Sequence, residues 1–307
     1  MNTPTVNHQF GFTSTTSDVL QGVDLTGKTA LVTGANTGIG FETARALASA
    51  DAAVIVTARD TAKAQAAVDQ ITNLTGNSRI TPLVLDLTDL DSVRTAAGTV
   101  SASLHILVNN AGIMAVPERT LSPQGHELQF ATNYLGHFAL TLGLHDALAA
   151  ARGSRIVCLS SNAHLYSPVV FGDLDYRFRA YDPIAAYAQS KTAHAMLAVE
   201  ATRRWNGDGI RANAANPGAI ATGLQKHTGG LKTPVERRKS IEQGAATSVF
   251  LAASPLVEGL GGRYFEDVAE APVRSESPGM SGTGVAYYVY DARLTSLLWD
   301  VAAELIG

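Results

Sequence analysis

From residue 28 onward, short runs of apolar and β-branched residues alternate with longer segments rich in Ala and Leu. The runs have the length of strands, and the segments between them have the length and composition of helices. Seven strands are expected, at residues 28–33, 53–58, 80–85, 104–109, 154–160, 210–216 and 261–265. This alternation predicts a parallel sheet with helices on both faces, and nearly continuous apolar strands fit burial on both sides. The pattern therefore predicts a single doubly wound α/β domain.

Three segments lie outside this alternation: a polar lead at residues 1–24, a segment at residues 162–183 and an extension at residues 266–307. Residues 25–265 are expected to form one domain, because no linker or internal repeat divides them. In open α/β sheets, ligands bind outside the carboxyl ends of the strands. Residues 162–183 directly follow such an end, so this segment is expected to lie near a ligand.

The composition narrows the classes of function. The 307 residues are 46% hydrophobic and 16% charged, and the formal net charge is −4. A nucleic-acid surface would be basic, so no nucleic-acid partner is predicted. No apolar run reaches the roughly 18 residues that span a membrane. The single cysteine, Cys158, excludes an intrachain disulfide and fits a reducing compartment. The first 18 residues lack the features of a signal peptide, so a cytoplasmic protein is expected.

The turn after the first predicted strand is rich in glycine: it reads "TGANTGIG" over residues 33–40, with a G-x3-G-x-G spacing. Glycines permit a tight turn and a close approach of the backbone. The start of the next helix then offers free N–H groups and the positive end of its dipole. A strand, such a turn and a helix together predict a cradle for the pyrophosphate of a dinucleotide, and hence a Rossmann-type fold.

The end of the second strand bears on the type of cofactor. An NAD enzyme usually has an Asp or Glu there to accept from the ribose 2′-hydroxyl, whereas this chain has Ala58, followed by Arg59 and Asp60. A guanidinium can bind a phosphate through two hydrogen bonds. The sequence therefore favours NADP(H), with NAD(H) as the alternative. In the other interpretation, Arg59 is a solvated residue before the next helix, and Asp60 offsets its charge.

Seven motifs occur in order between residues 28 and 265. They are "TGANTGIG" (33–40), "LDLTD" (85–89), "NNAG" (109–112), "ATNYLGHF" (131–138), "RIVCLSS" (155–161), "YAQSK" (187–191) and "NPGAIAT" (216–222). With these motifs the chain resembles the classical short-chain dehydrogenases/reductases. The lead, the extension and the interval of 26 residues from Ser161 to Tyr187 resemble the retinol dehydrogenase subgroup. Asp51 stands where many members have a glycine, and Asp tolerates the left-handed conformation better than most residues.

The resemblance implies an oxidoreductase that moves a hydride between a nicotinamide cofactor and a small carbonyl or alcohol substrate, and a homodimer or homotetramer. In the catalytic set that it implies, Asn133 holds a water, Ser161 binds the carbonyl oxygen, Tyr187 transfers the proton and Lys191 binds the nicotinamide ribose. The cofactor contacts that it implies come from the turns at the carboxyl ends of the strands and from the helix of Tyr187. They are Gly34, Asn36, Thr37, Gly38, Ile39, Gly40, Arg59, Asp86, Leu87, Asn110, Ala111, Gly112, Tyr187, Lys191, Pro217, Gly218, Ile220 and Thr222.

Tyr187 and Lys191 are four residues apart, so a helix places them on one face. A nearby ammonium favours the phenolate and is expected to lower the pKa of Tyr187 toward the range in which acid–base catalysis works best. Taken alone, such a pair is usually an ordinary helix surface. The three tyrosines of residues 162–183 have no lysine four residues further on, which leaves Tyr187.

No metal site is predicted. The eight histidines show neither the H-E-x-x-H motif nor a Cys/His ligand spacing. His137 and His145 fall in a helical pattern and are expected to be packing or surface residues.

Residues 162–183 contain five aromatic side chains: Tyr166, Phe171, Tyr176, Phe178 and Tyr181. Ligand sites are mostly apolar and aromatic, so the segment is interpreted as a wall or lid over a lipophilic carbonyl compound. A structural flap or a subunit contact is the alternative. The substrate itself stays open among sterols, retinoids, polyketides and small aryl ketones.

Among the functions on such a fold, an NADP(H)-dependent carbonyl reductase or alcohol dehydrogenase fits best. A non-catalytic, cofactor-binding regulatory protein is the alternative, but it would not need the four proton-relay residues. An epimerase or dehydratase would usually carry T-G-x-x-G-x-x-G, which residues 33–40 do not match.

Overall fold

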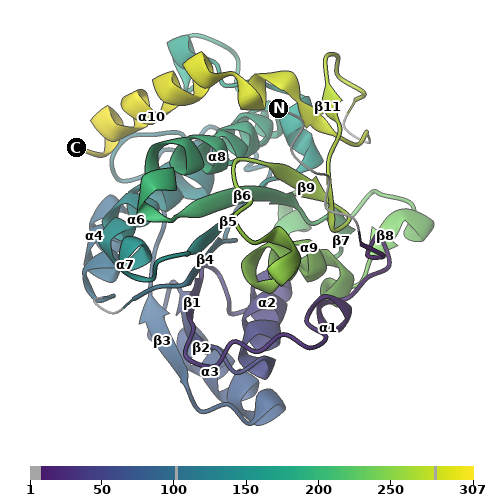
Figure 1. Ribbon diagram of the computed structural model, residues 1–307. Helices are drawn as coiled ribbons and strands as arrows, with labels where there is room; N and C mark the ends of the chain where they lie inside the picture. Colours follow the sequence, from purple (N-terminus) through teal and green to yellow (C-terminus); the bar gives the residue numbers. More distant parts are fainter. Residues whose placement is uncertain (1–7, 101–102, 280–281) are drawn as a thin grey trace.

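The computed structural model describes residues 8–100, 103–279 and 282–307. Its main sheet has eight strands in the order β10-β9-β6-β5-β4-β1-β2-β3, and every neighbouring pair except β10 with β9 is parallel (Figure 1). The parallel strands are β1 Thr29–Val32, β2 Ala53–Ala58, β3 Ile80–Val84, β4 Ile106–Asn109, β5 Arg155–Leu159, β6 Arg211–Asn216 and β9 Tyr264–Glu266. They correspond to the seven predicted strands, so the predicted Rossmann-type, doubly wound α/β fold is confirmed.

The eighth strand, β10 (Ala269–Glu270), is not apparent in the hydrophobic pattern. It turns back antiparallel on β9 through Asp267 and Val268, which both have left-handed backbones with φ of 50° and 63°. Two left-handed residues reverse the chain within the tight space of a two-residue loop. This reversal adds β10 as a short antiparallel strand at the edge of the sheet, beside β9.

The outermost strand at the other edge, β3, departs from the expected burial on both sides. Thr81, Pro82 and Val84 are exposed, because β3 pairs only with β2. Pro82 lacks the N–H that a central strand would use, and an edge strand tolerates it.

Helices cover both faces of the sheet. One face carries α2 (Gly38–Ser49), α3 (Thr61–Thr75) and α9 (Ile241–Ala253), and the other carries α4 (Leu90–Gly98), α6 (Gly136–Gly143) and α8 (Pro183–Trp205). Successive residues of a strand point to opposite faces. Accordingly, Leu31 packs in the core under α4, α6 and α8, and Val32 packs in the core under α2 and α9.

The remaining elements are short or lie beyond the sheet. They are α1 Thr16–Val19, α5 Leu128–Phe130, the π-helix η1 Ala131–Leu135, α7 His145–Ala150, the 3-10 helices η2 Asn162–Leu165, η3 Phe171–Asp173, η4 Asn206–Asp208, η5 Gly223–His227, η6 Val235–Arg237, η7 Pro255–Val257 and η8 Tyr287–Tyr290, the strands β7 Ala219–Ile220, β8 Arg238–Lys239, β11 Val273–Arg274 and β12 Val285–Ala286, and α10 Ala292–Ile306.

The described part of the N-terminal lead packs on the domain. Val19 and Leu25 belong to the core formed with α9, and the rings of His8 and Phe10 pack edgewise on Phe250 of that helix. These contacts join the lead to the face of the sheet that carries α2 and α9.

The C-terminal extension runs back across the opposite face, where α10 lies outside α8 and α6 (Figure 1). The ring of Trp299 on α10 packs edgewise against Trp205 and Phe138, at centroid distances of 5.2 and 5.0 Å. Thr295 donates to the buried carboxylate of Glu200 on α8 at 3.1 Å. The extension is therefore packed into the core of that face.

No helix within the described ranges combines the length and apolar character that crossing a bilayer requires.

Candidate active site

The glycine turn packs directly on the residues that follow β4. A Cβ atom at Gly40 would lie 2.4 Å from Asn110 Nδ2 and 2.5 Å from Gly34 O, so no larger residue fits there. Gly34 has a left-handed backbone (φ 63°), and a Cβ on it would approach the Ala111 side chain to 2.9 Å. The Asn110 amide donates to Thr33 O at 2.7 Å. Two motifs that are 77 residues apart thus form one unit at the carboxyl ends of β1 and β4.

The N-terminus of α2 fits an anion. Its N-cap residue, Thr37, makes no side-chain capping bond, so the first backbone N–H groups of this 12-residue helix stay available. Gly38, also left-handed, approaches the Thr222 methyl group: a Cβ on Gly38 would lie 3.4 Å from it. Asn36 and Ile39 lie half-buried in the same turn. This arrangement suits the pyrophosphate of a dinucleotide, held by backbone N–H groups and the helix dipole.

Arg59, directly after β2, has no acidic side chain paired with it in the described residues. The Arg59 side chain is exposed, and nothing in the described part of the chain forms a hydrogen bond or an ion pair with it. Asp60 is engaged elsewhere: it accepts from Lys63 N at 2.8 Å as the N-cap of α3, and it pairs with Lys63 Nζ at 2.9 Å. Asp60 therefore makes no ion pair with Arg59 within the described residues, and its carboxylate is held by Lys63 at the start of α3.

Asp86 and Leu87 follow β3 on the same edge of the sheet. One carboxylate oxygen of Asp86 accepts from the backbone N–H and the hydroxyl of Thr88, at 2.9 and 2.8 Å, which fixes its rotamer. Leu87 is buried, and its carbonyl would lie 2.3 Å from a Cβ on Gly136. This close packing joins the loop after β3 to the helix that follows Asn133.

The Pro217–Gly218 turn follows β6. Gly218 has a positive φ of 90°, and its N–H donates to Asn216 Oδ1 at 3.2 Å. The buried Lys239 side chain of β8 lies under the turn, because a Cβ on Gly218 would be 3.1 Å from Lys239 Cδ. Further along, Ile220 is buried against Gly244 of α9, and Thr222 caps η5 with its side chain.

Asn133 sits in the π-helix η1, and π-bulges are frequent at functional sites. The side chain is fully buried. Its Oδ1 accepts from Ile113 N at 2.9 Å, and its Nδ2 donates to Ile113 O and to Ser190 Oγ, both at 2.9 Å. These bonds tie Asn133 both to the loop after β4 and to α8, the helix of Tyr187 and Lys191.

Tyr187 and Lys191 lie on one face of α8, as predicted, with Lys191 Nζ 5.8 Å from the centre of the Tyr187 ring. Lys191 Nζ donates to Leu159 O at 2.7 Å. Gly112 separates the lysine from Asn133: a Cβ there would lie 3.4 Å from Lys191 Nζ and 3.1 Å from Asn133 Oδ1. The structure thus brings together the ends of β4 and β5 with α8.

Burial controls the protonation of this pair. Both side chains are only 4% exposed. Burial raises the pKa of Tyr187 to about 12, with the nearby Ser161 hydroxyl acting in the opposite direction. Burial likewise lowers the pKa of Lys191 to about 8. The predicted lowering of the phenol pKa is thus not found among the groups of the chain itself, because desolvation of the buried phenolate outweighs the hydrogen bond with Ser161.

Ser161 lies two residues after the end of β5 and is the N-cap of η2, where its Oγ accepts from Ala163 N at 3.2 Å. Ala163 packs with Tyr187 and Ala188, and Met114 from the loop after β4 lies against this small cluster. The surroundings of the tyrosine ring are therefore apolar and come from two loops at the same edge of the sheet.

A buried polar network beneath the site is not evident in the motifs. Thr33 Oγ1 accepts from Asn110 N and Ala111 N, at 2.8 and 2.9 Å, and lies 2.8 Å from His137 Nε2. His137 Nδ1 in turn lies 3.1 Å from Asn133 O. The predicted packing role of His137 is thus a hydrogen-bonded one, and it links the cofactor turn to the helix of Asn133.

Acid is expected to destabilise the fold through such buried histidines. Burial lowers the pKa of His137 to about 3 and that of His164 to about 4. The unfolded chain, with histidine pKa values near 6.5, therefore binds more protons than the folded chain. The free energy of unfolding should fall from about pH 6.5 downward, by up to about 1.4 kcal/mol per pH unit for each group. Urea unfolding between pH 7 and pH 5 measures this slope.

A variant pair isolates the effect. His137→Gln removes one titrating group and should flatten the pH dependence, whereas His227→Gln, at an exposed position, should leave it unchanged. Equal slopes in the two variants and the wild type would contradict the assignment.

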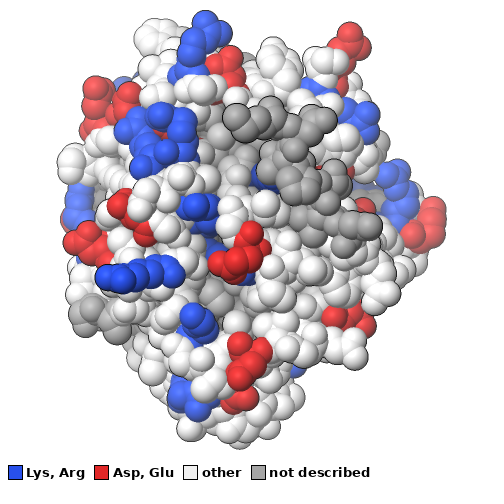
Figure 2. Space-filling view, viewed as in Figure 1, with Lys and Arg blue, Asp and Glu red and all other residues white. Residues whose placement is uncertain are grey.

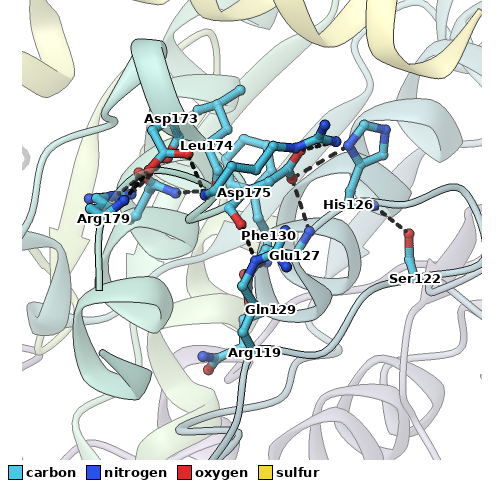
Figure 3. Close-up of polar contacts among 12 residues, drawn as sticks. Arg119, Ser122, His126, Glu127, Gln129, Phe130, Asp173, Leu174, Asp175 and Arg179 are labelled. Carbon is cyan, nitrogen blue, oxygen red and sulfur yellow. Dashed lines mark hydrogen bonds and ion pairs between the residues drawn. The ribbon is translucent and has the colours of Figure 1, made fainter. Parts of the chain in front are cut away.

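Residues 162–183 are fastened to the loop after β4 by a polar cluster (Figure 3). Asp175 accepts from Glu127 N at 3.0 Å and lies 3.5 Å from His126 Nδ1, and its carbonyl accepts from Arg119 Nε at 2.6 Å. The Glu127 carboxylate caps the start of the helix that leads to Asn133, accepting from Gln129 N and Phe130 N. The segment and this helix are therefore held in one arrangement.

Four of the five aromatic side chains of residues 162–183 fall into two groups: two are held by contacts and two are exposed. Tyr176 is buried under the Arg179 guanidinium, which lies 3.7 Å from its ring centre, and Tyr181 donates to Val116 O at 3.0 Å. These two support the flap interpretation. Tyr166 and Phe178 are exposed by 51% and 93%.

Within the described residues, no group of three or more His, Cys, Asp or Glu side chains could hold a metal ion. Cys158 is buried in β5, and burial raises the pKa of its thiol to about 12. On the face that Figure 2 shows, basic and acidic side chains are interspersed.

The family model described as short chain dehydrogenase matches residues 28–230, and the chain belongs to this oxidoreductase family. A Streptomyces antibioticus protein named "Probable oxidoreductase" is 47% identical over 301 residues, which are 92% of this chain and 99% of that one. Mouse polyprenol dehydrogenase is 44% identical over 260 residues, 80% and 77% of the two chains. Mouse retinol dehydrogenase 13 is 38% identical over 294 residues, 92% and 84% of the two chains. The resemblance inferred from the motifs is confirmed.

Two solved structures are also similar. An uncharacterized protein from Mycobacterium paratuberculosis is 34% identical, with a TM-score of 0.75 over 96% of this chain and 97% of that one. A structure from Beutenbergia cavernae, 28% identical, has a TM-score of 0.64 over 80% and 96% of the two chains, and it contains NADP at low occupancy. The family binds a nicotinamide cofactor, and the uncapped helix N-terminus beside the glycine turn fits one.

Proposed function

We propose that this protein is an NADP(H)-dependent oxidoreductase that interconverts a lipophilic alcohol and its aldehyde or ketone. The observation that carries the proposal is the meeting of Asn133 and Lys191 at Gly112, with Tyr187 on the same face of α8 as Lys191, at the same sheet edge as the glycine turn. Ser161 follows the neighbouring strand β5, near the tyrosine. A protein that only bound the cofactor would have no use for this set.

The chemistry follows from the groups. The nicotinamide, when bound, supplies or accepts the hydride. In reduction, the Tyr187 hydroxyl gives its proton to the carbonyl oxygen as the carbonyl carbon gains the hydride, and in oxidation the phenolate takes the proton from the alcohol. The Ser161 hydroxyl donates a hydrogen bond to the same oxygen, where negative charge develops. Lys191 stabilises the phenolate by its charge, and Asn133 holds the water through which the lysine exchanges protons with solvent.

The remaining assigned residues hold the cofactor in this proposal. The glycine turn with Gly34, Gly38 and Gly40 receives the pyrophosphate, the loop after β3 with Asp86 receives the adenine, and the Pro217–Gly218 turn supports the nicotinamide. These roles follow the order of the motifs along the edge of the sheet.

Arg59 is expected to select NADP(H). Replacing Arg59 with Ala removes the free guanidinium at the end of β2 and should raise KM for NADPH roughly 10- to 100-fold, the worth of one or two charge-assisted hydrogen bonds. KM for NADH should stay unchanged, because NADH has no 2′-phosphate. Steady-state kinetics with both cofactors measures the change. Arg79→Ala, which removes an exposed arginine paired with Asp51, is the control, and an equal effect of the two variants on NADPH would contradict the role.

The substrate is proposed to be a long isoprenoid or other lipophilic alcohol or aldehyde. The apolar surroundings of Tyr187 support this class, as do the polyprenol and retinol dehydrogenases among the relatives. A screen of retinaldehyde, a polyprenal and small aryl ketones with NADPH and with NADH tests it. We expect the highest kcat/KM for the long aldehydes. Turnover confined to small polar carbonyls would contradict the substrate class, and binding of NADPH without turnover of any carbonyl or alcohol would favour a regulatory protein.

Assembly and location are part of the proposal. We expect a homodimer or homotetramer in a reducing, cytoplasmic compartment. A second copy would have to bind elsewhere than on the outer faces of α8 and α6 that α10 covers. Light scattering at micromolar concentration measures the mass, and a monomer would contradict the oligomer.

A further inference from the structure

His164 lies three residues after Ser161 and is fully buried. Its backbone N–H and its ring Nδ1 both bond to Ser161 O, at 3.0 and 2.6 Å. A carbonyl oxygen only accepts hydrogen bonds, so Nδ1 carries the proton. The other ring nitrogen, Nε2, then has a free lone pair and accepts from Ala286 N at 3.2 Å. The Tyr264 hydroxyl also lies 3.2 Å from Nδ1, where its oxygen can share the same proton. Ser161 O and Ala286 N thus fix one neutral tautomer, and the ring bridges the serine and β12 of the C-terminal extension.

Two more bonds reach the same short helix from the extension. The Tyr288 hydroxyl donates to His164 O, and the Ser277 hydroxyl donates to Leu165 O at 2.8 Å. His164 O also accepts from Thr192, the residue that follows Lys191 on α8, at 3.2 Å. The helix η2 after the serine is therefore fastened both to the extension and to the helix of the proposed proton donor.

These contacts place the extension in a position to act on the site through η2, with the His164 ring as the link to Ser161 itself. The Ser161 hydroxyl must meet an oxygen that Tyr187 also serves, and a displacement of about 1 Å can cost roughly 100-fold in rate. The backbone of Ser161 is held at its carbonyl by the His164 ring, and that ring is held from behind by Ala286. A shift of β12 would therefore reach the serine through the imidazole.

We propose that His164 is a positioning residue that sets Ser161 in place and couples this placement to the docking of the C-terminal extension. The inference rests on the proposed function, since it assigns Ser161 its role toward the substrate oxygen. The glycine turn makes no contact with this bridge in the described residues, so cofactor binding at the turn should be independent of it.

Two amide substitutions test the two ring nitrogens of His164 separately. The amide nitrogen of Asn can take the place of Nδ1 and donate to Ser161 O, whereas the amide oxygen of Gln can take the place of Nε2 and accept from Ala286 N. His164→Gln should lower kcat roughly tenfold while KM and Kd for NADPH stay unchanged. His164→Asn should restore kcat to within roughly twofold of the wild type, because the donor to Ser161 O is retained.

The contribution of the C-terminal extension is tested by substitutions at the adjacent residues Tyr287 and Tyr288. Tyr288→Phe removes the hydroxyl that bonds to His164 O and to the Thr192 side chain, and it should lower kcat about threefold or more, with the Kd for NADPH unchanged. Tyr287→Phe is the matched control, because Tyr287 is 58% exposed and its side chain makes no hydrogen bond within the described residues. All rates are normalised to the concentration of NADPH-binding sites, so that a loss of folded protein does not count as a loss of kcat.

The outcomes distinguish this inference from the proposed function. A wild type without turnover, or Tyr187→Phe at full turnover, overturns the function. With the wild type active and Tyr187→Phe inactive, equal kcat in the wild type, His164→Gln and Tyr288→Phe overturns the inference. Equal losses in His164→Gln and His164→Asn also overturn it, because the effect would then not depend on the donor to Ser161. If His164→Gln binds no NADPH, Tyr288→Phe against Tyr287→Phe decides.

Discussion

Replacing Tyr187 with Phe should lower kcat for carbonyl reduction by roughly 100- to 10,000-fold, the usual contribution of a general acid. The phenol lies on α8, buried beside Ala163 and Met114, with the Lys191 ammonium 5.8 Å from its ring centre. Phe keeps the ring and its packing and removes only the hydroxyl group that would transfer the proton. The affinity for NADPH, measured by its fluorescence, should stay within about twofold of the wild type, because the described contacts of the glycine turn do not involve Tyr187.

Tyr134→Phe is the matched control for this change. Tyr134 is also fully buried, and its hydroxyl makes a long bond of 3.4 Å to Leu298 O on the far side of η1. Its loss should leave kcat near the wild-type value. Residual turnover of Tyr187→Phe at the level of the control would mean that another group transfers the proton.

Replacing Gly40 with Ala should have the second large effect, on cofactor binding and on stability together. The added Cβ would lie 2.4 Å from Asn110 Nδ2 and 2.5 Å from Gly34 O, and the second of these is backbone that cannot swing away. Overpacking of this kind costs about 1–3 kcal/mol. Because the displaced atoms form the proposed pyrophosphate cradle, the Kd for NADPH should rise at least roughly tenfold. Titration calorimetry and urea unfolding measure the two effects.

Gly98→Ala provides the comparison. Gly98 ends α4, has an ordinary helical backbone, and a Cβ on it would meet nothing within 4 Å. This change should be neutral or stabilise by about 0.5–1 kcal/mol, since Ala loses less conformational freedom on folding. An unchanged Kd for NADPH in Gly40→Ala would contradict the placement of the cofactor in the turn.

Several site features could be predicted from local sequence because their chemistry is local. Tyr187 and Lys191 share a helix face because they are four residues apart, and Gly34, Gly38 and Gly40 mark a turn that larger residues would obstruct. Asp51, a position at which the resemblance implied a glycine, is left-handed (φ 69°), as its side chain permits. Each of these inferences needs only the geometry of one element and the residues within it.

Other features depend on which residues meet in space. The expected lowering of the Tyr187 pKa is not found among the groups of the chain itself, because the desolvation of the phenol depends on everything packed around it, including Met114 of the loop after β4. Asp60 caps α3 and pairs with Lys63, and it makes no ion pair with Arg59 in the described residues. The role of His164 could not be read from residues 155–165 alone, since its partners Ala286 and Tyr288 lie more than 120 residues further along the chain.

By itself, the sequence determined the parallel sheet, the order of its motifs and the family. The periods of strands and helices and the positions of glycine turns depend on residues that are close together in the sequence. Only the tertiary structure decided how the site is supported: the glycine turn locked on Asn110, the histidines joined to Thr33 and Ser161, and the C-terminal extension closed over α8. Burial and hydrogen bonding between distant segments are properties of the packed chain, since each requires a partner that the local pattern does not contain.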